Sequence, residues 1–527
     1  MLSFIKRNLP LVSVVLLALA LRLWGDYFGL PKYFFHPDEP YAIMKAKLFF
    51  NPELRPVDGV TIFHLFLYLY QRFLALFIGG DKEAVSDYIF GGRLISGLLS
   101  TGSVILTYLL AKRLFRTKFA LIPALILATT FVDVQVAHYL RQDPYIQFFG
   151  LLFMLMYLKR NKWLLIYCFL IGVVSSLRFT AFIYLIPLFI VYLKETKIGA
   201  PKKLLYILFA LLVSSIGFAF GHPAAFLVEH DPIGYVKLYY NFITKNSFSQ
   251  AGIDSSNGVT SGYWWTKYLI TTGLFYPTFT YFVIGLTVWT TSVVRRLRKV
   301  DPLEVGIILA TLLYFIALFV KGVRFDRYII PITPFIVIIA AYPIVKISDF
   351  LKKKSLIARQ ITVIILCVIT IVPNLIRVII FDFLINQKDT RELAVDWIVE
   401  NYGRDEPIVA VGSAIQMGNE LYYGRKYSQI SNLFPLEDRD ALSKQSGNII
   451  VFDTWTLHEV KNYHNIDRYR DFYNNYLLIK EKGTLIKKFS QPLFATEFFS
   501  PFELESSASV NDYHNPSVEI YKIPKID

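Results

Sequence analysis

The segment Phe34-Phe-His-Pro-Asp-Glu-Pro-Tyr41 comes directly after the first of many hydrophobic stretches in the chain. It contains two adjacent acids, Asp38 and Glu39. Ionised groups are costly to hold near lipid, so the pair indicates a reaction or a bound cation. Pro37 and Pro40 flank the acids and disfavour a regular helix, which predicts a stiff, exposed loop. A solvated charge pair at the membrane interface is the alternative.

The composition is that of a membrane protein. Hydrophobic residues make up 54% and aromatic residues 16% of the 527 residues, more than a soluble globular chain carries. The formal net charge is +15, but the basic residues stand at the ends of apolar stretches. That distribution is typical of the positive-inside pattern and predicts no nucleic-acid partner. Cys168 and Cys367 lie inside apolar stretches, so neither a disulfide framework nor a thiolate metal site is expected.

The apolar stretches predict a polytopic α-helical membrane domain. A hydrocarbon core of about 30 Å needs roughly 17–25 helical residues. The aromatic stretch Thr61–Gly80 contains His64, Gln71 and Arg72, and we predict that it lies in the membrane plane as an amphipathic helix. The first stretch runs on to Trp24 and is interpreted as an uncleaved helix rather than a signal peptide. The eleven predicted transmembrane helices cover residues 8–28, 89–111, 119–138, 143–158, 163–178, 179–193, 204–221, 267–294, 304–320, 328–346 and 361–385.

The basic clusters predict the orientation in the plasma membrane. If Thr61–Gly80 crossed the membrane, every cluster from Lys112 onward would move to the outer side, against the positive-inside trend. The loop with Asp38 and Glu39, and everything after about Ile385, is therefore predicted to face outward. With the amino terminus inside, the clusters on the cytoplasmic side are Lys112, Arg113, Arg116 and Lys118; Lys159, Arg160 and Lys162; Lys194, Lys197, Lys202 and Lys203; Arg295, Arg296, Arg298 and Lys299; and Lys352, Lys353 and Lys354.

A soluble domain follows the membrane domain. The composition changes at Asn386, so we divide the chain into a transmembrane domain, residues 1–385, and an extracytoplasmic domain, residues 386–527. Residues 390–402 have helical spacing, with Leu393, Trp397 and Ile398 on one face, and residues 407–412, 447–452 and 517–521 are predicted strands. This alternation predicts a small α/β domain. No Gly-x-Gly-x-x-Gly motif follows a strand, so no nucleotide site is expected.

The predicted outer connections are rich in polar residues. Near residue 325, Lys321, Arg324 and Arg327 place three cations within seven residues, against the positive-inside trend. Arginine offers phosphate oxygens a planar fork of donors, so this cluster suits a lipid phosphate. Contact with anionic headgroups, or salt bridges to Asp326, are the alternatives. The other outer polar residues are Asp133, His138, Arg141 and Asp143; Arg178; and Glu229, His230, Asp231, Asn241, Lys245 and Asn246.

One predicted face therefore carries both carboxylates and cations. The carboxylates suit a base or a metal ligand, and the cations suit an anionic leaving group; together these serve the two ends of a displacement reaction. An outer site has no access to cytosolic nucleotide sugars. A lipid-linked phosphosugar overcomes this, because its isoprenoid tail partitions into the bilayer.

Four motifs in order resemble the GT-C membrane glycosyltransferases. They are Pro37-Asp-Glu-Pro-Tyr-Ala42, the stretch from Arg93 to Ser100, Arg141-Gln-Asp-Pro144, and the stretch from Arg324 to Pro334. Within that class the chain is most similar to the group of the dolichyl-phosphate-mannose protein O-mannosyltransferases and the lipid A aminoarabinose transferases. Trp264-Trp265 is followed by Thr266 rather than Asp, so the oligosaccharyltransferase branch is not assigned.

The resemblance implies roles for individual residues. Asp38 is the expected general base, and Glu39 orients it or contacts the acceptor. Asp143 is the second site carboxylate; a divalent metal, if there is one, would bind at Asp38 and Asp143. The donor phosphate is expected to face Lys321, Arg324, Arg327 and Tyr328, and the further active-site candidates are His64, Arg141 and Arg178.

The sequence therefore predicts an integral membrane glycosyltransferase. It transfers a mannose-like hexose or a pentose from a polyprenyl-phosphate donor to an acceptor hydroxyl of a protein, lipid or glycan, with inversion, at the outer face. A transporter or flippase of a lipid-linked saccharide is the alternative, using the same charges without chemistry. A transporter built from two repeated halves would show internal symmetry, and none is evident in the sequence.

Overall fold

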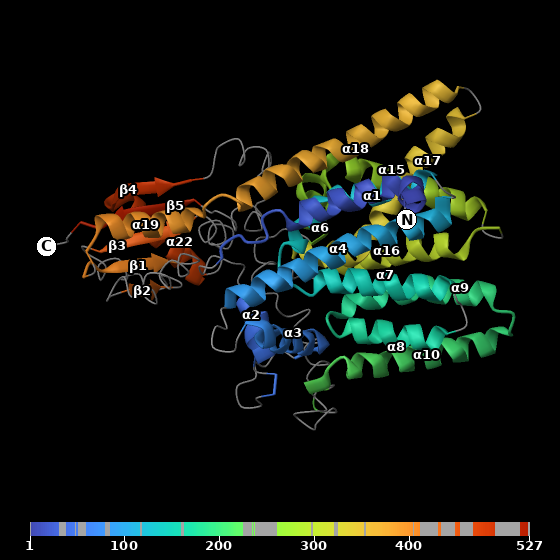
Figure 1. Cartoon of the computed structure of the whole chain (residues 1–527), viewed down its shortest axis with the longest axis horizontal. Helices are drawn as coiled ribbons and strands as arrows, with labels where there is room; N and C mark the ends of the chain where they lie inside the picture. Colours follow the sequence, from blue (N-terminus) through green and yellow to red (C-terminus); the bar gives the residue numbers. More distant parts are fainter. Residues whose placement is uncertain are drawn as a thin grey trace. The chain divides into compact units, whose positions relative to one another are not determined.

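The computed structural model resolves the chain into two compact units (Figure 1). Unit 1 comprises residues 1–26, 37–247 and 268–379, and unit 2 comprises residues 27–36, 248–267 and 380–527. The predicted boundary at residue 385 stays a prediction. The structure describes residues 2–30, 38–47, 49–50, 60–78, 85–115, 118–159, 163–224, 234, 237, 261–296, 299–320, 325–352, 355–403, 405–411, 430–433, 448–453, 467–490 and 517–524.

Unit 1 is helical, as the apolar stretches predict. In the described part of the chain, six helical segments are long and apolar enough to cross a membrane. They contain α4 (Val85–Phe115), α10 (Ala200–Phe220), α15 (Phe275–Arg295), α16 (Pro302–Val320), α17 (Thr333–Leu351) with the preceding 3₁₀ segment η6 (Asp326–Ile332), and α18 (Leu356–Ile385), whose last residues belong to unit 2.

The other five predicted spans are not among these six segments, so the total of eleven stays a prediction. The span predicted at 119–138 is broken, because Thr130 has an extended backbone between α5 (Leu121–Thr129) and α6 (Phe131–Ala137). The stretch predicted to lie in the membrane plane forms α3 (Ile62–Ile78). The remaining elements are α1 (Leu2–Leu23), η2 (Lys118–Ala120), α7 (Asp143–Lys159), α8 (Leu164–Ser175), η3 (Phe179–Tyr184), α9 (Leu185–Glu195), α14 (Ser261–Tyr268) and the π-helical turn η5 (Leu269–Gly273).

The first-loop acids lie on a helix, and the prediction of an exposed loop is wrong. Helix α2 (Asp38–Lys47) begins at Asp38, and Glu39 is completely buried. Pro40 is tolerated because the N–H groups of the first helical turn have no partner inside the helix. A proline in the first turn is therefore compatible with a helix that begins at Asp38.

Helix α17 forms the centre of unit 1. Every residue from Thr333 to Val345 is buried, so this helix is apolar around its whole circumference. It packs against α15, α5, α4 and α16. The approach to α15 is close, because a Cβ atom on Gly285 would collide with the Ile339 carbonyl oxygen. The segment η6 leads directly into this central helix, which gives it a rigid base.

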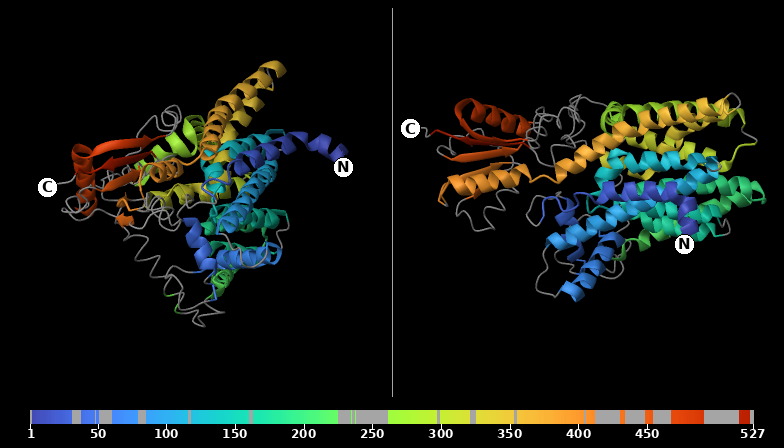
Figure 2. Two further views of the ribbon diagram at one scale, coloured as in Figure 1. Left: turned by 60° about the vertical axis from the view of Figure 1, so that its left-hand side comes forward. Right: turned by 45° about the horizontal axis from the view of Figure 1, so that its top comes forward.

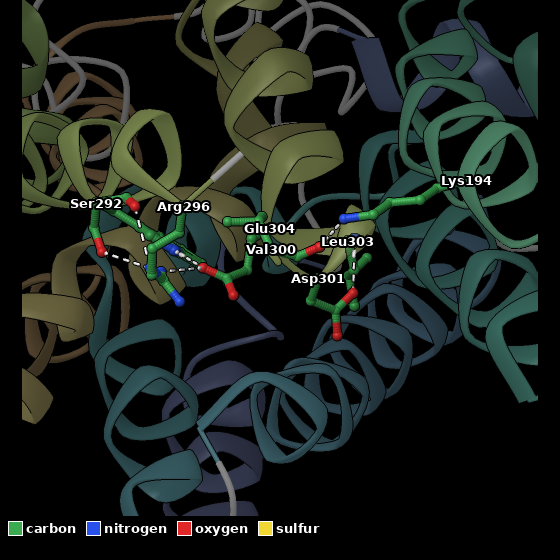
Figure 3. A network of polar contacts seen from close by, with 8 residues as sticks. Lys194, Ser292, Arg296, Val300, Asp301, Leu303 and Glu304 are labelled. Carbon is green, nitrogen blue, oxygen red and sulfur yellow. Dashed lines mark hydrogen bonds and ion pairs between the residues drawn. The ribbon is translucent and has the colours of Figure 1, made fainter. Parts of the chain in front are cut away.

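Several connections predicted to be cytoplasmic meet at one end of unit 1. Arg113 donates to the Leu158 carbonyl at 2.6 Å and pairs with Glu195 at 3.8 Å. Figure 3 shows the neighbouring network, in which Lys194 donates to the Val300 carbonyl and Arg296 pairs with Glu304 at 3.3 Å. Successive predicted spans run in opposite directions, so these connections should lie at the same end of unit 1, as the contacts show. This holds whichever side of the membrane that end faces.

Unit 2 contains a five-stranded mixed sheet in the order β2-β1-β3-β5-β4. The first three strands run parallel, and β5 is antiparallel to both β3 and β4. The predicted helix and strands are found as α19 (Thr390–Asn401), β1 (Ile408–Val411), β3 (Ile449–Asp453) and β5 (Val518–Lys522). Three further elements of this unit were not predicted from the sequence: β2 (Ile430–Leu433), α22 (Asp467–Lys482) and β4 (Thr484–Phe489).

Helices α19 and α22 cover opposite faces of this sheet, as the right-hand view of Figure 2 shows. Alternate side chains of a strand point to opposite faces. Val451 packs in the cluster with α19, whereas the ring of Phe452 lies 5.4 Å from that of Tyr476 on α22. The buried face of α19 contains Ile398 as predicted, but Leu393 is exposed.

Candidate active site

An ion pair between Glu39 and Arg93 fixes the first-loop helix. The Nε and Nη2 atoms of Arg93, on α4, donate to the two carboxylate oxygens of Glu39, each at 2.7 Å. Neither side chain has exposed surface. The Leu140 N–H donates to the same carboxylate at 2.9 Å, and Arg93 also donates to the Asp26 carbonyl at 2.7 Å. Glu39 is therefore held rigidly and has its charge balanced, which suits an orienting group better than a base.

Asp38 is the first residue of α2, so its backbone position is fixed by the neighbouring Glu39. Its side chain lies outside the described part of the structure, as do Lys321 and Arg324. The role of Asp38 as base, and those of Lys321 and Arg324 as phosphate ligands, stay predictions.

The connection between α6 and α7 links the two predicted carboxylate sites. Leu140 donates to Glu39, and three residues further on Asp143 begins α7 and forms an ion pair with Arg178. The guanidinium of Arg141, between them, lies 5.2 Å from the ring centroid of Tyr139. One short segment therefore contacts the first-loop helix and presents the second acid.

Two arginines from different elements converge on one tyrosine. The guanidinium carbon of Arg178, which precedes η3, lies 4.8 Å from the ring centroid of Tyr328. That of Arg327 lies 5.9 Å from the same centroid and 4.2 Å from that of Phe325. We call Asp143, Arg178, Arg327 and Tyr328 the arginine cluster. It joins three segments that are far apart in the sequence and contains four of the predicted site residues.

His64 lies on α3 as a neutral ring. Its Nδ1 atom accepts the Thr61 N–H at 3.1 Å, which leaves the ring proton on Nε2. Burial lowers the pKa of His64 to about 3, with further lowering by the charges of Lys45 and His222. The neighbouring Phe63 ring lies 5.2 Å from that of Tyr145, two residues after Asp143. Helix α3 thus contacts the start of α7, but no described contact joins His64 to the arginine cluster.

Three buried polar residues near the predicted site residues had no predicted role. Arg93 appeared only as part of a motif, and its pairing with Glu39 is not visible from spacing. Asp26 is buried, and neither carboxylate oxygen has a hydrogen-bond partner in the described part of the chain. Gln147, on α7, donates to the Ile330 carbonyl of η6 at 2.9 Å. The one feature of the sequence that could have indicated a role for Gln147 is that it is a polar residue inside an apolar stretch.

The metal site at Asp38 and Asp143 stays a prediction, because the side chain of Asp38 lies outside the described part of the structure. Among the described residues, no group of three or more His, Cys, Asp or Glu side chains is placed to hold a metal ion. Of the two predicted ligands, Asp143 is paired with Arg178. A cation competing for Asp143 would have to displace that guanidinium.

Part of this region is similar to a known protein family. Residues 65–218 match the family model described as dolichyl-phosphate-mannose-protein mannosyltransferase. This stretch contains Arg93, Asp143 and Arg178, and the match confirms the resemblance derived from the motifs. Over this stretch the chain is therefore similar to a family of glycosyltransferases.

Three solved structures align with most of the chain, and one of them has a TM-score above 0.5. The oligosaccharyltransferase of Archaeoglobus fulgidus, in complex with zinc and sulfate, aligns with 14% identity and a TM-score of 0.51, over 85% of this chain and 68% of that one. ArnT from Cupriavidus metallidurans bound to undecaprenyl phosphate aligns over 98% of both chains, with 12% identity and a TM-score of 0.49. Its apo state gives 11% identity and a TM-score of 0.49, again over 98% of both chains. A search of curated protein sequences gave no significant match.

Proposed function

We propose that the chain transfers one sugar from a polyprenyl-phosphate donor to an acceptor hydroxyl at the outer face of the plasma membrane. The observation that carries the proposal is the convergence of Arg178 and Arg327 on Tyr328, beside Asp143. The segment that presents Asp143 also contacts the helix that begins at Asp38. The matching family is named for a donor of this kind, dolichyl-phosphate mannose.

The arginine cluster suits the leaving group. When the bond between C1 of the sugar and the phosphate oxygen breaks, negative charge grows on that oxygen. Arg327 and Arg178 provide planar sets of N–H donors, and the pairing with Asp143 orients Arg178 before the substrate arrives. Such preorganised donors stabilise the transition state more than the ground state. Lys321 and Arg324 extend the cluster in this proposal.

Asp38 serves as the general base. An ionised carboxylate at the first position of a helix faces unpaired N–H groups, which favour the charged form. Glu39, held by two hydrogen bonds of 2.7 Å from Arg93, fixes the direction in which α2 starts. The base then takes the proton of the acceptor hydroxyl while the oxygen attacks C1 from the face opposite the phosphate. A single displacement of this kind inverts the configuration at C1.

The substrate range follows the earlier expectation. The sugar is a mannose-like hexose or a pentose, and the acceptor is a hydroxyl group of a protein, a lipid or a glycan. The isoprenoid tail of the donor lies in membrane lipid next to unit 1, so the donor reaches the site from within the bilayer.

The test is transfer of a labelled sugar by the purified full-length protein in liposomes. Polyprenyl-phosphate mannose and polyprenyl-phosphate aminopentose are supplied in parallel, and both release of polyprenyl phosphate and transfer of the label are measured. Asp38→Asn should lower turnover about 10²–10⁴-fold, the usual contribution of a general base. Asp349→Asn, an acid near the other end of α17, is the matched control.

Two outcomes would reject the proposal. Movement of intact donor between leaflets without cleavage would favour the flippase alternative. An Asp38→Asn variant that retains more than about a tenth of wild-type turnover would remove Asp38 as the base.

A further inference from the structure

Two prolines leave carbonyl groups of η6 without their usual backbone donors. In a 3₁₀ helix the carbonyl of residue i accepts the N–H of residue i+3, and in an α-helix that of residue i+4. Pro331 and Pro334 have no N–H, so the Tyr328 carbonyl lacks its 3₁₀ donor and the Ile330 carbonyl lacks its α-helical donor. The latter still accepts the N–H of Thr333. Residues 329–332 are buried, so polar groups of this backbone must find partners within the protein.

Side chains from three other elements supply these donors. The Tyr314 hydroxyl, on α16, donates to the Tyr328 carbonyl. Gln147 Nε2, on α7, donates to the Ile330 carbonyl at 2.9 Å. The Tyr184 hydroxyl, at the end of η3, donates to the Pro331 carbonyl at 2.6 Å. The backbone that carries Arg327 and Tyr328 is therefore held from three sides.

Gln147 is the most strongly constrained of these donors. Its Nε2 atom lies 2.7 Å from Asp133 Oδ1 and 2.8 Å from Thr333 Oγ1, as well as 2.9 Å from the Ile330 carbonyl. Asp133 Oδ1 and the carbonyl are acceptors, so the amide has one satisfactory orientation. Gln147 is 1% exposed, Asp133 2% and Thr333 0%. Asp133, on α6, thus sets the direction of the Gln147 amide, and Gln147 sets the position of η6.

We propose that Gln147 is a positioning residue of the transfer reaction: oriented by Asp133, it holds the η6 backbone so that Arg327 and Tyr328 meet Arg178. This inference rests on the proposed function of the arginine cluster. Gln147 does not touch the substrate in this scheme. It acts on turnover because displacing a catalytic group by about 1 Å lowers the rate about 10²-fold.

The test compares variants of the full-length protein in the liposome assay. Gln147→Leu removes the only contact between α7 and the Ile330 carbonyl that is described here, while the N–H and hydroxyl of Thr333 still donate to that carbonyl. It also leaves the Asp133 carboxylate buried without its amide partner. We expect turnover to fall about 10–100-fold, whereas the KM for the polyprenyl-phosphate sugar changes by less than about threefold, because the loss acts mainly on the transition state. Thermal stability also falls, so a second variant is needed to separate the two effects.

The double variant Gln147→Leu/Asp133→Leu provides that separation. Replacing both partners of a buried polar contact by apolar groups of similar size is close to neutral for stability. We expect the double variant to regain most of the lost thermal stability but not the lost turnover, because the Ile330 carbonyl still lacks the amide. Asn374→Leu is the matched control. Asn374 is a buried amide on α18 that donates to the Leu274 carbonyl at 2.9 Å, and its loss should lower stability with little change in turnover.

Three results would overturn the inference. They are unchanged turnover in Gln147→Leu, recovery of turnover together with stability in the double variant, and an equal loss of turnover in Asn374→Leu. Failure of the proposed function is recognised separately. If Arg327→Ala and Tyr328→Phe keep full turnover, the arginine cluster has no role; if they lose turnover and Gln147→Leu does not, only the positioning role is rejected.

Discussion

Asp143, the first residue of α7, forms an ion pair with Arg178, and the same guanidinium lies over the ring of Tyr328. The Asp143 side chain is 1% exposed and that of Arg178 is 13% exposed. One arginine therefore balances a buried acid and also contributes to the cluster that faces the proposed phosphate. Substitution of Arg178 should therefore affect stability as well as turnover.

We expect Arg327→Ala to lower turnover about 10²–10³-fold, the usual effect of removing a preorganised donor to a developing anion. Its thermal stability should stay close to that of the wild type, because Arg327 is partly exposed. Arg327→Lys should recover only part of the activity, since an ammonium lacks the planar fork. Turnover and thermal unfolding measured on the same preparations would check this, and full activity of Arg327→Ala would remove it from the mechanism.

Arg178→Ala should lower both activity and stability. It leaves the buried Asp143 carboxylate without its counter-ion, a loss of about 3 kcal/mol in the free energy of unfolding for a well-buried pair. Arg178→Ala/Asp143→Ala should regain most of that stability without regaining turnover. Denaturant unfolding of the single and double variants gives the coupling energy. A coupling energy near zero would show that the pair is not formed in solution.

Separating Glu39 from Arg93 should be among the most destabilising changes in unit 1. Breaking a fully buried ion pair from one side typically costs about 3–5 kcal/mol, because the remaining charge is left in a low-dielectric interior. Glu39→Gln and Arg93→Leu should therefore each lower the unfolding temperature sharply, and the double variant less than the sum of the two. Wild-type unfolding temperatures for both single variants would contradict this.

His64 should make the protein less stable in acid. Its pKa is lowered by burial from 6.5 to about 3, so between these values the unfolded chain binds a proton that the folded protein does not. Stability then falls as the pH drops below 6.5, by up to about 1.4 kcal/mol per pH unit. His64→Asn keeps an acceptor near the Thr61 N–H and should flatten the profile of unfolding temperature between pH 7 and pH 5. Part of the slope will remain, because burial also lowers the pKa of His222, to about 4. An unchanged slope would show that His64 is not buried as a neutral ring.

The orientation can be tested with reporters. A reporter after Asp527 should be active only on the outer side, and one inserted near Lys353 only in the cytoplasm. An inside location for the carboxy terminus would mean that α3 crosses the membrane, or that one of the short predicted spans does not.

The sequence was sufficient for features that depend on local pattern. Apolar stretches located the long helices of unit 1, and β-branched runs located β1, β3 and β5. The prediction of a loop at residues 34–41 was wrong because the effect of a proline depends on its position. A proline breaks a helix in the middle but not in the first turn, and Pro40 lies in the first turn of α2. The sequence pattern also placed Leu393 on the buried face of α19, whereas Arg391 is buried there and is held by Asp389 at 2.7 Å.

The candidate site was only partly predictable, because its geometry depends on distant contacts. Asp143, Arg178 and Arg327 stood out as charged residues in the predicted outer connections, and Tyr328 through the motif that contains Arg327. The structure brings the four together. Gln147 and Ile330 are 183 residues apart, and nothing in either segment indicates the other. The same holds for Arg93 and Glu39, which are 54 residues apart.

The Glu39–Arg93 pair has a consequence for biosynthesis. Arg93 lies in the first third of α4, where an arginine raises the insertion free energy by less than the roughly 2.5–3.5 kcal/mol that applies at the centre of a helix. Glu39 leaves the ribosome earlier, on the short helix α2 that precedes α4. We expect Glu39 to neutralise the charge of Arg93 while α4 enters the bilayer, so that the insertion of α4 depends on the earlier placement of α2. Without Glu39, Arg93 would lack this partner, and α4 would then insert less efficiently.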